Sequence, residues 1–417
     1  MAWAVYWLVS PVPRRAQRPY RFLLLLFAAI ACAEDDTPAT FRAKTDLVLV
    51  PVVVRDKQGR AIGNLRQEDF QVFDRRKPQV VTSFSIESSG ADPAPAEPHV
   101  AESKPPAAPY HFVVYLFDDV HLSSTDLAAV RDAAERHLKD SLGPADRAAI
   151  FATSGRTMLD FTNDSAKLHE ALLKLRPQPI ARPMGKECPD VSYYQADLIV
   201  NKHDPGALQT AVQDAFICMN LPDLHLAPPI AQAAARRALS AGDTESRVAL
   251  GMVGKVVRAL STVPGQRSIV LISPGFLTLA DLQQDSTAIM DLAIRSNIII
   301  SSLDARGLYT VVPGGDAGQA VQNAAQTQYQ GAGASSDEDV LSGLADGTGG
   351  AFFHDNNDLV EGFRRVAARP EYVYVLGFSP RDLKPDGKFH DLKVTLKDPA
   401  KLTLQARRGY YAPKPGK

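Results

Sequence analysis

The residues of this chain best suited to chemistry stand together in the stretch 117–124, FDDVHLSS, directly after a run of apolar residues. Asp118, Asp119 and Ser123 offer the hard oxygen ligands that Mg²⁺ prefers, and His121 adds an imidazole. The apolar run is typical of a strand buried on both faces of a parallel sheet. Such sheets bind ligands beyond the carboxyl ends of their strands, so the spacing predicts a binding site or a metal site here.

The elements that would position these residues alternate between apolar strands and helical patterns over residues 110–369. This alternation predicts an α/β fold with a doubly wound, mostly parallel sheet. The loops that follow two later strands contain Phe276, Leu277, Asp304 and Tyr309. We expect these four residues to share the edge of the Asp118 stretch and to contribute to one binding surface.

An enzyme is the alternative, because Asp118, Asp119 and His121 could hold a metal ion that assists hydrolysis. The sequence has no G-x-S-x-G motif around Ser273, no H-E-x-x-H pair, and no phosphate-binding glycine loop between a strand and a helix. A second cluster of His and Asp that would face the first cannot be placed from the sequence. We therefore predict a protein without catalytic residues, and keep an uncharacterised metal-assisted hydrolase as an alternative.

Charge and composition exclude one class of partner. The chain has 46 Lys and Arg against 47 Asp and Glu, a formal net charge of −1. Nucleic-acid binding needs a concentrated basic face, and basic residues gather only near the N-terminus and in the short stretch 407–411. We expect no nucleic-acid partner.

The N-terminus has the pattern of a secretory signal at residues 1–33. Four arginines without any acidic residue precede the short apolar run 22–33, FLLLLFAAIACA, which ends in a small-residue site. The pattern predicts export to the periplasm, the outer envelope or the medium. Two alternatives keep contact with a membrane: retention of this segment as an anchor, or lipidation at Cys32.

Export also decides how the remaining cysteines are interpreted. Cys188 and Cys218 are the two left after removal of the signal, and an even number in an oxidising compartment favours a disulfide bond between them. A metal pair is less favoured, because neither cysteine has a second cysteine or a histidine at ligand spacing.

Both ends of the mature chain have strand periodicity. Residues 41–87 and 370–413 alternate with period two, and neither half has enough strands to close a core, so we predict one β-sandwich-like module built from both. A Pro- and Ala-rich linker at 88–109 leads from the first half into the α/β domain. Inside that domain, the cysteine-bearing segment 176–231 is predicted to be an insertion, a helix is expected from about residue 244, and residues 311–336 are expected to form a loop.

Several stretches together resemble a known family: FDDVHLSS, LDFTNDSAKL, CPDVSYYQADLIV, GQRSIVLISPGF, LDARGLYT, TGGAFFHDNNDL, YVLGFSP and ARRGYYAP. They resemble the acidobacterial family of von Willebrand factor A-related proteins, and the resemblance covers residues 41–413. It implies an exported domain like von Willebrand factor A, framed by the β module. The biochemistry of the family does not settle a function.

By the same resemblance, ordinary A domains bind Mg²⁺ through an Asp-x-Ser-x-Ser loop, a threonine of a second loop, and an aspartate after the fourth strand. Here His121 stands where the first serine belongs, and the fourth strand ends in Ser273-Pro-Gly without an acid. The threonine has no match, because the cysteine-bearing insertion replaces its loop. Asp119 and Ser123 remain as metal ligands, with Asp118 as a substitute.

These comparisons predict a degenerate metal-ion-dependent adhesion site and no cofactor, apart from Mg²⁺ if the site still binds it. The function we expect is adhesion to, or binding of, a protein or another extracellular or envelope macromolecule. A metal-dependent adhesin with a working Mg²⁺ site is the alternative within this class.

Overall fold

The computed structural model describes residues 47–57, 60–88, 111–144, 146–180, 188–308, 324–368, 372–380, 387–399 and 402–412. The predicted signal segment, nearly all of the predicted linker, and Tyr309 lie outside these residues. All described residues belong to one compact unit. Among the helices of these stretches, none combines the length and the apolar character needed to cross a membrane.

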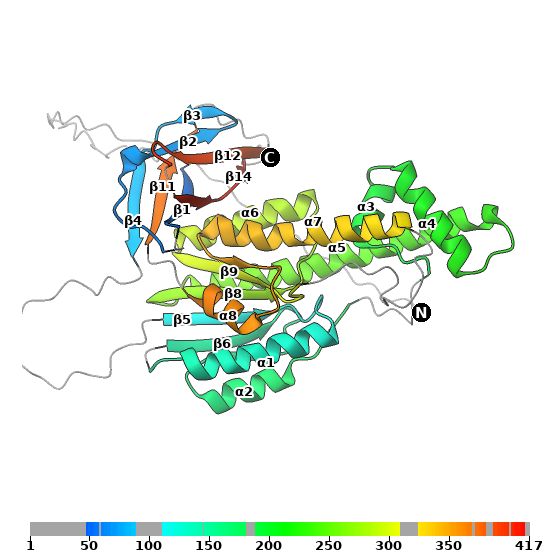
Figure 1. The fold of residues 1–417 in the computed structure, drawn as a ribbon, viewed down its shortest axis with the longest axis horizontal. Helices are drawn as coiled ribbons and strands as arrows, with labels where there is room; N and C mark the ends of the chain where they lie inside the picture. Colours follow the sequence, from blue (N-terminus) through cyan, green and yellow to red (C-terminus); the bar gives the residue numbers. More distant parts are fainter. Residues whose placement is uncertain are drawn as a thin grey trace, which may run out of the picture. The chain divides into compact units, whose positions relative to one another are not determined.

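A six-stranded sheet forms the centre of the α/β part, in the order β10-β9-β8-β5-β6-β7 (Figure 1). Its neighbours are parallel except for β7, which turns back antiparallel to β6. The first strand of this part, β5, has β6 and β8 on its two sides, so its carboxyl end faces both of their loops. The strands are β5 (His111–Phe117), β6 (Asp146–Ala152), β7 (Met158–Thr162), β8 (Gln266–Ser273), β9 (Ile298–Asp304) and β10 (Phe352–Phe353).

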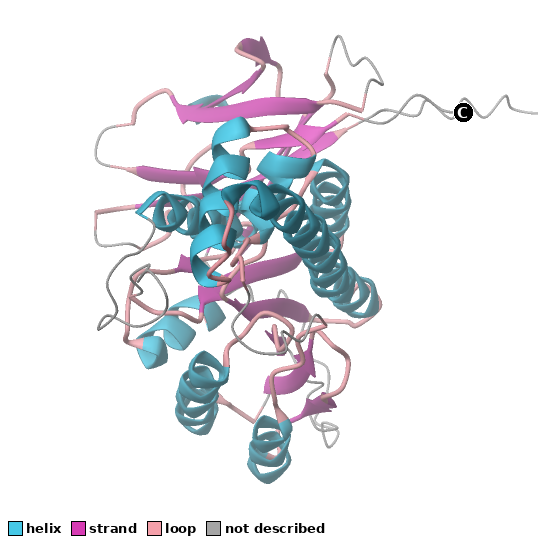
Figure 2. Ribbon diagram, turned by 90° about the vertical axis from the view of Figure 1, so that its right-hand side faces the viewer, coloured by secondary structure: helices cyan, strands magenta, loops and turns pink. Residues whose placement is uncertain are grey.

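Helices cover both faces of this sheet, which explains why its central strands are mostly apolar (Figure 1 and Figure 2). One face packs against α1 (Ser124–Ser141), α2 (Ser165–Lys174) and α8 (Leu359–Ala367). The other packs against α5 (Ala227–Leu260), α6 (Ala280–Arg295) and α7 (Ala324–Thr348). The structure is therefore an α/β fold with a mostly parallel sheet between two helical layers.

Strands from both ends of the chain form two further sheets, each with four strands. Their orders are β13-β1-β11-β4 and β14-β12-β2-β3, so each sheet pairs N-terminal with C-terminal strands. Tyr374 lies fully buried between them, where its ring packs against Phe70 and Phe84. The strands are β1 (Val48–Arg55), β2 (Phe70–Asp74), β3 (Lys77–Gln79), β4 (Ser83–Ser88), β11 (Tyr372–Phe378), β12 (Phe389–Leu396), β13 (Thr403–Ala406) and β14 (Gly409–Tyr411), and a short 3-10 helix, η1 (Gln67–Asp69), precedes β2.

Polar contacts join this β module to the helices of the α/β part. Arg407 donates from Nη1 to Asp291 Oδ1 of α6 at 2.6 Å, and Gln405 donates to Asp346 Oδ1 of α7 at 3.0 Å. Val53 and Val373 also pack against Ile299 of β9 in a small apolar cluster. These contacts fix α6 and α7 against the strands from the C-terminus.

A helical extension follows Cys188 and includes Cys218. It consists of α3 (Tyr193–Val200), α4 (Pro205–Cys218), the 3-10 helix η2 (Leu224–Leu226) and the first half of α5, and Figure 1 shows it projecting beyond the central sheet. Cys188 and Cys218 form a disulfide bond with a Cα–Cα distance of 5.9 Å. The core of the extension is mostly alanine, including Ala196, Ala207, Ala211, Ala231 and Ala235.

Two element predictions were wrong. The helix expected from about residue 244 begins at Ala227 and runs for 34 residues, so the predicted insertion boundary at 231 falls inside it. Residues 324–336, predicted to be part of a loop, are the first half of α7. Both segments are rich in small residues, which blurs the apolar period of a helix, and both are stabilised by packing against α3 and α4.

Candidate functional site

The turn that follows β5 places two carboxylates beneath the surface. Its backbone is fixed by hydrogen bonds from Asp118 N to Ile272 O of β8 and from Leu122 N to Asp118 O. The backbone N–H of Thr153, after β6, donates to Phe117 O. Asp118 and Asp119 are both buried, with exposures of 0% and 1%. Buried carboxylates must be hydrogen-bonded, so their partners decide what the site can do.

Asp118 accepts three side-chain hydrogen bonds. Thr153 Oγ1 donates to Oδ1 at 2.8 Å, Ser273 Oγ donates to Oδ2 at 2.7 Å, and His121 Nδ1 lies 2.9 Å from Oδ2. Burial raises the pKa of Asp118, but the charge of His121 and the three hydrogen bonds outweigh it and lower the pKa below the usual value. Asp118 is therefore a carboxylate whose oxygens accept hydrogen bonds from other side chains of the protein.

Asp119 is turned toward the loop after β6. Its Oδ1 accepts from the backbone N–H of Ser154 at 2.8 Å, and its Oδ2 accepts from Ser154 Oγ at 2.6 Å. Thr153 Oγ1 lies 3.1 Å from Asp119 Oδ1 and so shares its hydrogen between the two aspartates. The backbone N–H of Gln178 donates to Asp119 O at 2.6 Å, which brings the segment after α2 across this edge of the sheet.

The imidazole of His121 occupies the space beside Asp118. Its ring stacks on Phe276, with centroids 5.3 Å apart and planes inclined by 15°. Burial lowers the pKa of His121, but Asp118, followed by Glu245 and Asp337, outweighs this effect and raises the pKa above its usual value. When it is protonated, His121 places positive charge at the carboxyl end of β5.

The backbone of the loop after β8 lies in close contact with the backbone of α7. Gly275 has a φ of +92°, and a Cβ at this position would lie 2.3 Å from Asp337 O. Phe276 N donates to the same carbonyl at 3.1 Å, and Ser273 Oγ accepts from Gly275 N at 3.0 Å. Burial raises the pKa of the Asp337 side chain to about 6. Only glycine suits this turn, because it needs positive φ and close contact together.

Two other predicted site residues, Asp304 and Ser123, form side-chain hydrogen bonds away from Asp118. Asp304 is buried and forms a bidentate ion pair with Arg306. Arg306 also forms an ion pair with Glu338 at 2.7 Å. Ser123 is exposed and caps α1: its Oγ accepts from Asp126 N and donates to Asp126 Oδ2. Asp118, Asp119, His121 and Phe276 are therefore neighbours, Leu277 is half-buried beside Phe276, and Ser123 points to its own helix.

Sequence reasoning missed Thr153, Ser154 and the acceptor role of Asp118 toward Ser273. The signal was present, because Thr153 and Ser154 follow the buried run of β6 and Ser273 ends β8. In the part of the chain that the structure describes, no group of three or more His, Cys, Asp or Glu side chains could hold a metal ion.

His121→Gln is expected to destabilise the protein most strongly at acidic pH. Because the folded-state pKa of His121 is raised, its stabilising effect is fully present below the ordinary value of 6.5 and is lost as the pH rises through the folded value. The free energy of unfolding of wild type and variant, measured by urea denaturation across this range, should converge as the pH rises.

His137 provides the matched control for this pH dependence. It accepts or donates at 2.9 Å with the Tyr115 hydroxyl, and burial lowers its pKa below 6.5. The sign is therefore reversed: the advantage of wild type over His137→Gln should shrink as the pH falls. The same trend in both variants would contradict the assignment of charge to His121.

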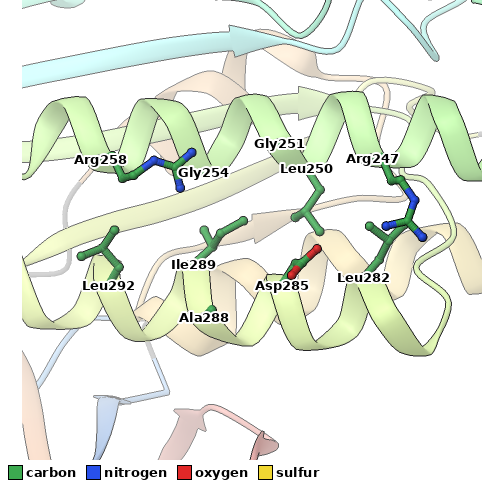
Figure 3. A pocket seen from close by; sticks show the side chains of 10 residues that line it. All are labelled: Arg247, Leu250, Gly251, Gly254, Arg258, Leu282, Asp285, Ala288, Ile289 and Leu292. Atoms are coloured by element: carbon green, nitrogen blue, oxygen red, sulfur yellow. The ribbon is translucent and has the colours of Figure 1, made fainter. Parts of the chain in front are cut away.

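A groove between α5 and α6 is a separate feature of the surface (Figure 3). Its volume is about 550 Å³, and Leu250 and Ile289 form part of its apolar floor. Arg247 and Arg258 of α5 stand near its two ends, with Asp285 of α6 between them. Asp118, Asp119 and His121 do not line it.

Comparisons with known proteins give only distant likenesses. No protein-family model matches the chain, and no curated protein matches it in sequence. An aerotolerance-related membrane protein from Bacteroides fragilis matches in structure with 12% identity and a TM-score of 0.34, over 62% of this chain and 96% of that one. The conserved hypothetical protein BatB from Bacteroides thetaiotaomicron matches with 12% identity and a TM-score of 0.32, over 62% and 97%. Likenesses with TM-scores this low carry no conclusion about function.

Proposed function

We propose that this chain is an exported module, similar to a von Willebrand factor A domain, that binds a protein or another envelope macromolecule without a divalent metal ion. The observation that carries this proposal is the hydrogen bonding of Asp118. Each oxygen of this carboxylate already accepts from a side chain of the protein, and the imidazole of His121 occupies the position beside it.

The residues at this edge do not suit Mg²⁺. The ion requires a near-octahedral set of oxygen ligands, whereas Asp118 and Asp119 each accept three hydrogen bonds and Ser123 belongs to the cap of α1. The imidazole beside Asp118 presents Nδ1 to the carboxylate as a donor when it is protonated. Binding would therefore rest on surface contacts rather than on a metal bridge.

Exposed apolar side chains supply such contacts on the helical extension. Met219, Leu224 and Leu226 are each about half exposed, at the end of α4 and in η2. Leu308, 64% exposed, follows the Asp304 turn after β9. Large apolar side chains that remain exposed are typical of interaction surfaces, and these lie outside the closed Asp118 cluster.

Hydrolysis is less well supported. Asp118 and His121 have the geometry with which a buried carboxylate orients a histidine base. Among the described residues, no hydroxyl or thiol is hydrogen-bonded to the second ring nitrogen of His121. The ring also stacks on Phe276, which is 2% exposed, so we propose a packing role for this pair.

Mg²⁺ is expected to leave the stability of the protein unchanged. A working site at about 100 times its Kd would raise the free energy of unfolding by about 2.7 kcal/mol. Thermal melting with EDTA and with millimolar Mg²⁺ measures this difference. In His121→Ser the imidazole is replaced by the hydroxyl that an Asp-x-Ser-x-Ser loop requires, so stabilisation by Mg²⁺ confined to this variant would show that His121 blocks the ion.

The binding itself is tested with full-length protein immobilised on beads and an envelope fraction of the source cells. A specifically retained macromolecule should stay bound in EDTA, and its capture should fall when Met219, Leu224 and Leu226 are changed to serine. Release by EDTA that Mg²⁺ restores, together with loss of capture in Asp119→Ala, would overturn the metal-independent mechanism. No retained macromolecule would overturn the binding function.

A further inference from the structure

A cavity of about 530 Å³ lies where the β module meets the helices of the α/β part. Its walls come from α6, from the second half of α7, and from the strands β12 and β14 with the turn before β14. This volume falls within the range of about 300–1,000 Å³ that is usual for small-molecule sites, which favour junctions of this kind. The cavity is separate from the Asp118 cluster.

The charges on the walls of this cavity balance. Asp339 and Asp346 line it from α7, and Arg407 and Arg408 line it from the β module. Burial raises the pKa of Asp346, an effect that Arg408 opposes. Two carboxylates and two guanidinium groups give no net preference for an anion or a cation, and they favour a ligand that is neutral yet can both donate and accept hydrogen bonds.

Arg407 leaves one donor unmet. It is 2% exposed, and its Nη1 donates to Asp291 Oδ1 at 2.6 Å and to Leu49 O at 3.2 Å. Its Nε donates to Gly409 O at 2.9 Å. In the described part of the chain, Nη2 is buried without a hydrogen-bond partner. A buried unmet donor is costly, so a neutral oxygen acceptor that reached Nη2 would lower this cost.

The other walls combine hydroxyls with an exposed aromatic ring. Thr278 and Ser286 contribute hydroxyl groups, which can donate and accept. Phe389 is 48% exposed although it lines the cavity, and its ring lies over Gly409, where a Cβ would come within 2.2 Å of it. A ring held in this way against the backbone offers a firm apolar platform to a ligand.

We propose that this cavity binds a neutral saccharide. The hydroxyls of a sugar ring donate to carboxylates, accept from guanidinium groups, and exchange both with Ser and Thr, while the C–H face of the ring packs on an aromatic side chain. Carboxylates, guanidinium groups, hydroxyls and an aromatic ring all line this cavity. The inference goes beyond the proposed binding function and assigns a second, separate site, for a glycan of the envelope or a free oligosaccharide.

The test uses two variants of α7 that differ in position alone. Gly343 lines the cavity, and a Cβ built there meets nothing within 4 Å, so Gly343→Leu is expected to place a side chain in the cavity. Gly331 lies on the same helix outside the lining residues and is equally open, so Gly331→Leu is the matched control. Replacing glycine in a helix interior favours the helix, so both variants should fold.

Wild-type protein is applied to an array of neutral glycans, and the glycans that bind are then titrated as soluble oligosaccharides by calorimetry. Gly343→Leu and Phe389→Ala should each weaken the affinity at least about tenfold, the loss expected of a central anchor. Gly331→Leu should bind like wild type. Binding to the immobilised glycan but not to the oligosaccharide assigns an envelope polymer, whereas binding to both assigns a sugar of either origin.

Three results would overturn the proposal: no binding to any neutral glycan, binding that Gly343→Leu leaves intact, or a preference for carboxylates such as hexanoate over sugars. The proposed function fails separately, because it is tested by capture in the presence of EDTA and by substitution of the exposed residues of the helical extension. Sugar binding that disappears in Gly343→Leu but persists in Gly331→Leu would support the saccharide site.

Discussion

Asp118→Ala is expected to lower the free energy of unfolding by about 3–5 kcal/mol, the usual cost of removing one partner from a buried ion pair. The substitution leaves the hydroxyls of Thr153 and Ser273 without their shared acceptor and leaves His121 without its counter-charge. All of these atoms lie at the carboxyl end of the central sheet, where β5, β6 and β8 meet. Urea denaturation followed by circular dichroism measures the loss.

Asp132→Ala is the matched control, because Asp132 lies on α1 with a side chain that is 63% exposed. It should change the free energy of unfolding by no more than about 0.5 kcal/mol, as is usual for surface positions. A double-mutant cycle of Asp118→Ala with His121→Ala isolates the interaction, and its coupling energy should fall within about 0.5–3 kcal/mol. Independent effects of the two substitutions would contradict a charged pair.

The sequence pattern predicted the edge of the sheet but not the contacts made there. Strand β5 ends just before Asp118, and β8 and β9 end on Ser273 and Asp304, as the largely apolar runs before these residues indicate. The partners of Asp118 lie 35 and 155 residues away, in Thr153 and Ser273. Periodicity fixes which residues face the core, and it contains no information on which hydroxyl reaches which carboxylate.

The β module illustrates the opposite case. Both ends of the chain alternate with period two, and strands from both ends do pair in each of the two sheets, as between β1 and β11 or β12 and β2. Alternation was informative there because strands such as β2 and β12 bury one face and expose the other. In α7 and in the first half of α5, by contrast, alanine and glycine dominate, so the apolar period is weak and tertiary packing decides the helix.

The closed cluster and the open surfaces have different physical roles. Asp118, Asp119 and Ser273 are buried, so their polarity serves to hold the loops after β5, β6 and β8 together. A domain with its loops fixed in this way can present a rigid surface, which reduces the entropy lost on binding. The exposed side chains of the helical extension and the cavity beside α7 are the parts to which we assign the proposed contacts.

Replacing both cysteines of the extension by serine is expected to lower the stability of the extension by about 3–4 kcal/mol, because the bond closes a loop of this length. Cys188 and Cys218 are separated by 30 residues and tie the start of the extension to the end of α4. The core between α3, α4 and α5 is mostly alanine, and each buried alanine contributes little apolar area. The disulfide therefore carries a large share of the stability of this region.

Hydrogen exchange followed by mass spectrometry localises this effect. Protection should fall in α3 and α4 of the double variant, while β5 and β8 keep theirs, because the central sheet has its own core on both faces. Wild type treated with a reductant should behave like the variant, which controls for the serine side chains. Capture of the envelope macromolecule should weaken with the extension, whereas saccharide binding beside α7 should persist. Equal loss of protection in the extension and the sheet would show instead that the two unfold as one unit.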